Sequence, residues 1–224
     1  TFFYDNDDGY RIIFERSTKI KILSKAGLDY AQVEIPYYVE NSDMEKVYDI
    51  EGYTYGFDGA DQKISRLDPD NTFDEKLSDH WMVKKFALPD VKEGSVIEYR
   101  YKVISPYFFN LRDWEFQSRI PVAYSEYTTR MIPFYEYHYI FQGASKFDVY
   151  RNTVDNFKRR FGSVEFTDNI FTFGMKNIPA FRDEDYITSI NDYIMKIDFQ
   201  LAVIHYPNGS KVDIVTTWPL LIQS

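Results

Sequence analysis

Alternation of apolar and polar residues dominates the pattern of this chain. It is clearest in three long stretches: Tyr10–Leu23, Ser95–Ile104 and Tyr193–Tyr206. A period of two predicts a strand with one buried face, because successive side chains of a strand point to opposite sides. The residues that this pattern places in the core on the last two stretches are Tyr99, Tyr101, Phe199 and Leu201.

Shorter strands are predicted between these stretches, because prolines and glycines divide the chain into strand-length pieces. They are expected at Tyr30–Tyr38, Gln62–Leu67, Trp81–Leu88, Arg112–Ile120, Ala123–Ile132, Glu136–Gln142 and Lys211–Trp218. Ser42–Glu45 fits a helix capping box. The residues that follow, Val47–Gly59, are β-branched and aromatic and contain three glycines, so strand and turn are expected there instead of helix.

The segment Val164–Gly174 predicts a hairpin of its own. Asp168 and Asn169 stand at its centre, and both residue types tolerate the positive φ of a two-residue turn. Such a turn would place Phe166 opposite Phe171 on one face of the hairpin. The segment Ile178–Asn191 is expected to form a long connection with at most one helical turn.

These patterns favour an all-β fold with little helix, since no helical period extends past one or two turns. The economical architecture is an antiparallel two-sheet β-sandwich, either immunoglobulin-like or supersandwich-like. No low-complexity linker divides the chain. A single sandwich domain is therefore expected over residues 1–218, with residues 219–224 as the start of a linker to a missing downstream domain.

The composition of the chain agrees with an all-β protein and excludes several kinds of binding and catalytic site. Aromatic residues make up 19% of the chain, and they suit a pleated, half-buried surface. The net charge of −9 disfavours binding to nucleic acid or to anionic lipid, which both require a basic surface. The chain has no cysteine, so it contains no disulfide, thiolate metal site or cysteine nucleophile. No apolar run approaches the roughly 20 residues of a membrane helix, so no membrane insertion is expected.

A search for reactive groups finds no catalytic motif, and we expect no catalytic residue, no metal site and no cofactor. The three histidines are widely separated, and the acidic run Asp183–Asp185 is typical of a solvated loop. One aromatic cluster remains. If exposed, it would form a stacking surface for a sugar or a partner protein; if buried, which we favour, it would fill the core between the sheets. Its members are Tyr107, Phe108, Phe109 and Trp114.

Several segments also carry a family resemblance, in order and over nearly the whole chain. They read KIKILSKAGLDYAQVEIPYY, KFALPDVKEGSVIEYRY, SPYFFNLRDWEFQ, IPVAYSEY, NIPAFRDEDY and FQLAVIHYPNG. Together they resemble a bacterial domain of unknown function found N-terminal to transglutaminase-like domains, a transglutaminase-associated N-terminal β-sandwich family. One departure is Arg112, which stands where the family pattern has proline.

The resemblance implies a noncatalytic accessory or interaction domain of a secreted multidomain protein. The parent protein would be extracytoplasmic, in the periplasm or at the cell surface, with a signal peptide outside this chain. Its transglutaminase-like, cysteine-protease-like domain would lie downstream and would be the main partner. The expected interdomain contact is Trp218, Leu220, Leu221 and Ile222. The alternative is a glycan- or peptide-binding β-sandwich module that acts through an exposed aromatic face.

Overall fold

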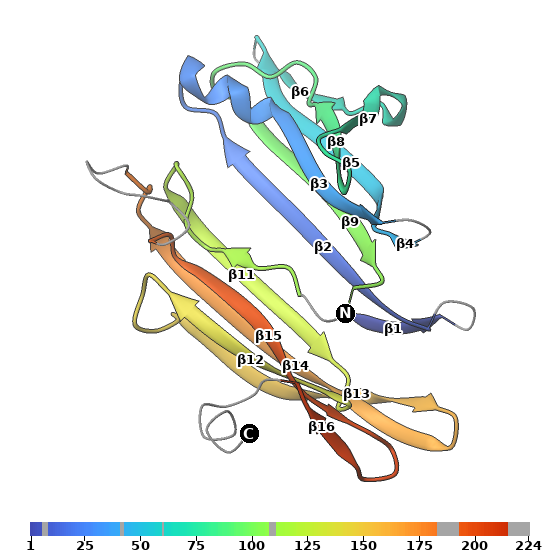
Figure 1. Cartoon of the computed structure of the whole chain (residues 1–224). Helices are drawn as coiled ribbons and strands as arrows, with labels where there is room; N and C mark the ends of the chain where they lie inside the picture. The colour runs from blue at the N-terminus through green and yellow to red at the C-terminus, as the bar shows by residue number, and fades with distance from the viewer. Residues whose placement is uncertain (6–8, 41–42, 60, 108–110, 183–192, 215–224) are drawn as a thin grey trace. The chain divides into compact units, whose positions relative to one another are not determined.

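The computed structural model is all-β, as the sequence predicts, and its strands form antiparallel sheets (Figure 1). It describes residues 1–5, 9–40, 43–59, 61–107, 111–182 and 193–214. The chain divides into two compact units, an N-terminal unit of residues 3–106 and a C-terminal unit of residues 107–224 together with residues 1–2. A single domain over residues 1–218 stays a prediction.

Two sheets build the N-terminal unit. The strands of the first, in spatial order, are β1 (Phe2–Asp5), β2 (Gly9–Lys21), β9 (Val96–Ser105), β5 (Lys46–Asp58) and β6 (Asp61–Arg66). Those of the second are β4 (Asp43–Met44), β3 (Gln32–Glu40), β8 (Trp81–Ala87) and β7 (Thr72–Lys76). Two 3₁₀ helices, η1 (Lys25–Ala31) and η2 (Pro69–Asn71), precede β3 and β7. Neither has the length and apolar character that a membrane crossing requires, and no other described segment is such a helix.

The core of this unit lies between the two sheets. Ile35 of β3 and Phe86 of β8 come from one sheet, and Ile97 and Tyr101 of β9 come from the other; all four are buried. Tyr99 is partly buried and packs edge-on against Phe86, with ring centroids 6.0 Å apart. The predicted inward face of β9 is therefore confirmed, and the packing is that of a sandwich.

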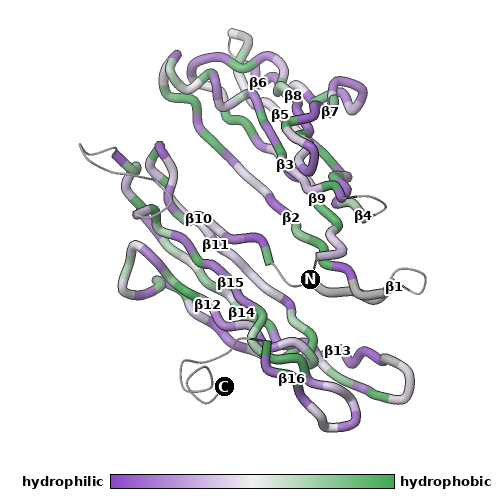
Figure 2. The backbone as a smooth tube through the Cα atoms, viewed as in Figure 1, coloured by the Kyte–Doolittle hydropathy of each residue, from purple (hydrophilic) through white to green (hydrophobic). Residues whose placement is uncertain are grey.

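Two further sheets build the C-terminal unit. The first holds β10 (Trp114–Glu115), β15 (Lys196–His205) and β12 (Tyr135–Gln142) in that order, with β16 (Lys211–Asp213) paired to β15. The second holds β11 (Val122–Met131), β14 (Val164–Ile178) and β13 (Val149–Phe161). Figure 2 shows the hydrophobic and hydrophilic positions as successive changes of colour along these strands.

Aromatic rings fill the space between the two sheets of this unit. Phe173 of β14 is almost completely buried, and its ring centroid lies 5.1 Å from that of Tyr139 on β12 and 6.1 Å from that of Phe199 on β15. Phe116 and Phe141 meet edge-on at 6.1 Å nearby. Such tilted and edge-on pairs are the favoured aromatic geometries. Phe199 and, beside it, Leu201 are buried, as predicted.

The predicted hairpin around Asp168 is wrong. Residues Val164–Ile178 form one continuous strand, β14, and the turn comes earlier, at Gly162 and Ser163, where Phe161 pairs with Val164. Gly162 has φ +58°, which glycine adopts without strain. Strand β13, which precedes this turn, is not predicted by the sequence pattern. It contains a bulge, since residues 155–157 of β13 lie opposite the single residue Asp168.

Other boundaries also differ from the prediction. The strand expected at Arg112–Ile120 is reduced to the two residues of β10, and the strand expected from Tyr30 begins only after η1. The capping-box segment forms no helix in its described residues. Instead the buried carboxylate of Glu45 accepts the backbone N–H of Tyr38 at 2.9 Å, which ties β3 to the strand that follows.

Candidate functional site

The predicted aromatic surface is only partly described, because Phe108 and Phe109 lie outside the described residues. Trp114 is half-buried and stacks on Tyr127 of β11, with ring centroids 5.5 Å apart. Its indole Nε1 donates a hydrogen bond to Ser125 Oγ at 2.9 Å. Trp114 is therefore part of the aromatic layer between the sheets. Tyr107 is half-buried, and a binding role for the cluster stays a prediction.

The predicted interdomain contact, Trp218 with Leu220, Leu221 and Ile222, also lies outside the described residues, as does the acidic run Asp183–Asp185. Within the part of the chain that is described, no three histidine, aspartate or glutamate side chains come together as a metal site.

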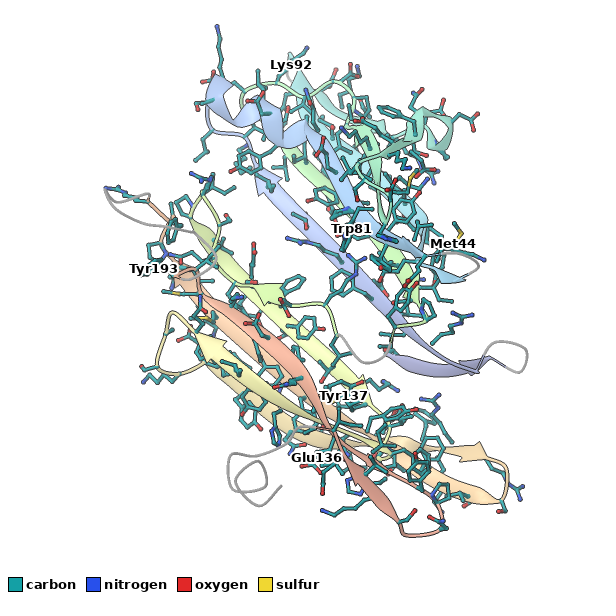
Figure 3. All side chains as sticks on the ribbon, in the orientation of Figure 1. Met44, Trp81, Lys92, Glu136, Tyr137 and Tyr193 are labelled. Carbon is teal, nitrogen blue, oxygen red and sulfur yellow. The ribbon has the colours of Figure 1, made fainter. Side chains whose placement is uncertain are left out.

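The structure instead brings five short segments of the C-terminal unit together around a pocket of about 590 Å³. We call it the proline-rimmed pocket. Two of its residues, Gly143 and Tyr193, lie just after β12 and shortly before β15. Tyr193 is labelled in Figure 3. Others come from the connection after β10 and from the facing ends of β11 and β14: Gln117, Pro121, Pro179 and Phe181.

The two prolines reach the same rim because of strand pairing. Strands β11 and β14 are antiparallel, and Val122 at the start of one pairs with Ile178 at the end of the other. Pro121 directly precedes the first of these residues, and Pro179 directly follows the second. Proline has no N–H for the ladder, so each one ends the pairing at this point. Each of the two prolines follows an isoleucine in the sequence.

A buried glutamine fixes the floor of the pocket. Gln117 Nε2 donates to the backbone carbonyl of Pro179 at 3.1 Å, and its Oε1 accepts the backbone N–H of Met195 at 3.3 Å. The backbone N–H of Phe116 also donates to the carbonyl of Met195, at 2.8 Å. One amide side chain thus connects the segments after β10, after β14 and before β15. These hydrogen bonds hold the three segments in place relative to one another.

Gly143 closes one side of the pocket through its backbone. Its φ is +80°, and a Cβ at this position would lie 2.9 Å from the Cα of Met195. Both the left-handed conformation and the close approach of two backbones require glycine here.

The described lining of the pocket is mostly apolar and aromatic. Its described residues include prolines, Phe181, Tyr193 and Met195, with the cation Arg182 at the rim. Among them is no serine, cysteine, histidine or carboxylate that could serve as nucleophile or base. Apolar and aromatic walls with a few polar groups, at a volume of about 300–1,000 Å³, are typical of ligand sites.

A pair of acidic residues lies elsewhere on the same unit. Asp113 precedes β10, next to Asp198 of the paired strand β15. Although Asp113 is partly exposed, burial of the rest of its carboxyl group and the charge and hydrogen bond of Asp198 raise the pKa of Asp113 to about 6. Lys196 Nζ lies 3.0 Å from Asp198 Oδ2 and opposes this effect. Neither carboxyl lines the proline-rimmed pocket.

Comparison with known proteins places the chain in a family. A family model described as a domain of unknown function with a solved structure, DUF3857, matches residues 10–182, so the chain belongs to the DUF3857 family. No curated protein matches the chain.

One solved structure is similar in fold. It is the crystal structure of a putative protease from Parabacteroides distasonis ATCC 8503, with a TM-score of 0.66 and 15% sequence identity. The similarity covers 89% of this chain and 38% of that one. The chain therefore spans well under half the length of the Parabacteroides protein. At this identity the likeness concerns the fold alone.

Sequence reasoning missed the proline-rimmed pocket. Three of its segments, around Gln117, Pro121 and Pro179, belong to the stretches that carry the family resemblance. The Ile-Pro pair does not mark the pocket, because it also occurs at Ile35-Pro36 and Ile132-Pro133, which do not line it. Nothing in the sequence pattern distinguishes Gln117, because its role depends on contacts with Pro179 and Met195, which lie far along the chain.

Proposed function

We propose that this chain is a noncatalytic accessory domain that holds an extended peptide segment for a transglutaminase-like, cysteine-protease-like domain downstream on the same secreted polypeptide. The observation that carries the proposal is the proline-rimmed pocket, which has apolar and aromatic walls but no nucleophile or base among its described residues. The similarity of the chain to 38% of a longer protein described as a putative protease supports a place in such a polypeptide. The transglutaminase-like partner rests on the resemblance of the sequence motifs.

An extended peptide fits this pocket for a physical reason. Proline and aromatic surfaces bind extended and polyproline-type segments, whose low conformational freedom in solution reduces the entropic cost of ordering. Pro121, Pro179 and Phe181 supply such surfaces, and the phenol of Tyr193 adds a polar group at the rim. Arg182 offers a charged hydrogen bond to a carboxylate of the same peptide.

The peptide site can be tested with matched tyrosine variants. Tyr193 and Tyr206 flank β15 and are similarly exposed, at 54% and 47%, but only Tyr193 lines the pocket. A library of proline-containing peptides, with and without an acidic residue, is titrated against the full chain by fluorescence polarisation. We expect Tyr193→Ala to weaken binding about tenfold or more and Tyr206→Ala to leave it unchanged. Equal effects of the two variants, or no binding peptide, would overturn the peptide site.

The context of the chain is tested by the native gene. We expect its reading frame to continue beyond Ser224 into a domain with a cysteine, a histidine and an aspartate. The chain alone should not cleave or crosslink peptides. When the chain is added to the separately expressed downstream region, the KM of that region should fall for the peptides that the chain binds. A reading frame without such a domain, or turnover by the chain alone, would contradict the proposal.

A further inference from the structure

The outer edge of strand β12 is a surface that the proposed function does not use, and we call it the β12 edge. Strand β12 is the last strand of its sheet, and of the described strands only β15 pairs with it. Alternate N–H and C=O groups of such a strand point away from the sheet, where another strand can bond them. Glu136 and Tyr137, at the start of β12, are labelled in Figure 3.

The β12 edge lacks the features that usually prevent the addition of another strand. Proline, charged side chains, bulges and very short strands make an outer strand a poor template. The segment Tyr137–Gln142 contains no proline, lysine, arginine, aspartate or glutamate, and its pairing with β15 is regular. The outermost strands β6, β7 and β13 differ, because each of them carries several charges. The β12 edge is therefore suited to accept a strand.

Aromatic surface lies open on the inner side of this edge. Tyr139 of β12 and Tyr150 of β13 pack on Phe173, with ring centroids 5.1 and 5.6 Å from that of Phe173. The two tyrosines are nevertheless 43% and 51% exposed. A strand added to β12 would place its inward side chains beside Tyr139. Apolar residues at these positions would remove aromatic surface from water, which is favourable.

The outer side of the β12 edge combines an apolar side chain with acidic ones. Ile140 is 60% exposed and lies opposite Asp198 of β15. Glu136, on the same side of β12, has a side chain that is 53% exposed and lies 3.2 Å from His205 Nε2. A lysine or arginine of an added strand can lay its methylene groups on Ile140 and direct its charge toward one of these carboxylates.

Negative charge predominates on this face of the sheet. Asp113 is adjacent to Asp198, and Glu115 of β10 pairs with Lys196 of β15. Lys196 Nζ lies 3.0 Å from Asp198 Oδ2, so its charge offsets one carboxylate. The other lysine in the described strands of this sheet, Lys211, is paired with an aspartate of its own strand. The face therefore attracts a basic segment and repels an acidic one.

We propose that the β12 edge binds an extended segment of a partner protein as an added strand, in which apolar residues on the Tyr139 side alternate with lysine or arginine on the Ile140 side. Main-chain hydrogen bonds would supply affinity, and the alternating side chains would supply specificity. A second copy of this chain fits less well, because two chains joined through β12 would bring two acidic faces together.

The test titrates the full chain with a synthetic peptide of about eight residues in which valine and lysine alternate, followed by NMR. The peptide should bind saturably, and those amide protons of His138–Phe141 that point away from β15 should exchange more slowly with solvent. The same peptide with glutamate in place of lysine should bind at least about tenfold more weakly.

Two N-methylated forms of the peptide test whether it binds as a strand. One form is methylated at all valines and the other at all lysines. Only alternate N–H groups of a strand face the same neighbour, so one form should bind and the other should not. Equal binding of the two forms would contradict pairing with β12.

Matched variants of the chain assign the binding to this edge. Ile140→Lys should weaken binding about tenfold or more, whereas Ile64→Lys, at an isoleucine of β6 that is 58% exposed, should not. Glu136→Gln should weaken binding about two- to fivefold. Glu75→Gln, at a side chain that is also 53% exposed, should leave binding unchanged. Tyr193→Ala should bind like the wild type, because Tyr193 belongs to the proline-rimmed pocket.

Three outcomes would overturn the proposal: no saturable binding of the valine–lysine peptide, equal binding of the lysine and glutamate peptides, or unchanged binding in Ile140→Lys. Self-association of the chain that Ile140→Lys abolishes, measured by sedimentation velocity, would overturn it in favour of a second copy. None of these results bears on the peptide site of the proline-rimmed pocket, which Tyr193→Ala tests.

Discussion

Arg159 of β13 donates a hydrogen bond through Nη1 to Oδ2 of Asp168 on β14, at 2.9 Å. The aspartate is completely buried, and the guanidinium carbon of Arg159 also lies 5.6 Å from the ring centroid of Phe166. Asp168 faces the bulge of β13, where the strands are furthest from regular pairing. The ion pair therefore lets a charged residue occupy the middle of a continuous strand.

Replacing Arg159 should destabilise the fold, because the buried charge of Asp168 then has no cation beside it. We expect Arg159→Met to lower the free energy of unfolding by about 3–5 kcal/mol, because it leaves Asp168 buried without its cation. The measurement is urea denaturation. Lys158→Met is the matched control, since Lys158 forms an exposed ion pair with Glu165 at 3.4 Å and should cost less than about 0.5 kcal/mol. If the two variants lost the same free energy of unfolding, the buried pair would contribute no more to stability than the exposed pair.

Phe199 should be essential for the aromatic layer. Its ring centroid lies 5.4 Å from that of Tyr127 and 6.1 Å from that of Phe173. Phe199→Ala should lower the free energy of unfolding by about 3–5 kcal/mol, the usual loss for a buried aromatic side chain. Phe157→Ala, at the exposed bulge of β13, should change it by less than about 0.5 kcal/mol. A small effect at Phe199 would contradict the packing between the two sheets.

The acidic pair should make stability depend on pH. The pKa of Asp113 is raised to about 6 in the folded chain, so between about pH 4 and pH 6 the folded state binds a proton that the unfolded state has released. The free energy of unfolding therefore falls as the pH rises from about 4 to about 6, because Asp113 must lose its proton in the folded state. Asp113→Asn should be more stable than the wild type by about 1 kcal/mol at pH 7, a value reduced for solvent screening, and equally stable near pH 4.

Denaturation curves at several pH values test this difference. Asp29→Asn, at an exposed residue of the N-terminal unit, removes the same charge and should show no gain at pH 7. A constant difference between Asp113→Asn and the wild type from pH 4 to pH 7 would contradict the role of Asp113.

Two glycines with positive φ should respond differently to alanine. Gly209 has φ +85° and open space around it, so Gly209→Ala should cost about 1–2 kcal/mol from backbone strain alone. At Gly143 the added Cβ also meets the backbone of Met195, so Gly143→Ala should cost about 1–3 kcal/mol more. It should also weaken peptide binding, because Met195 lines the proline-rimmed pocket. Thermal unfolding and the peptide titration measure both effects; equal costs at the two positions would contradict the close approach.

Strands with one buried face are the part of the fold that the sequence predicts well. The inward residues of β9 and β15 alternate with polar ones, and the structure buries Tyr101, Phe199 and Leu201 as expected. Strand β13 was missed because most of its side chains are exposed on both faces, so it has no period of two to detect. Asp168 and Asn169 were mistaken for a turn because local turn chemistry says nothing of a partner on another strand.

The proline-rimmed pocket is harder to predict than the strands, because its residues lie far apart in the sequence and come together only in the folded chain. Trp114 illustrates this: its residue type fits a binding surface or a core equally, and its contacts with Ser125 and Tyr127 become known only from the structure.

The bulge of β13 has a further consequence, for the behaviour of the chain in concentrated solution. Strand β13 is the outermost strand of its sheet, and a regular outer strand is a template on which another chain can add and start a fibre. Residues 155–157 interrupt that template, and Arg151, Lys158 and Arg160 place positive charges along it. A second copy of the same strand would meet like charges and an irregular backbone. The bulge therefore makes this edge of the sheet a poor template for the addition of another strand.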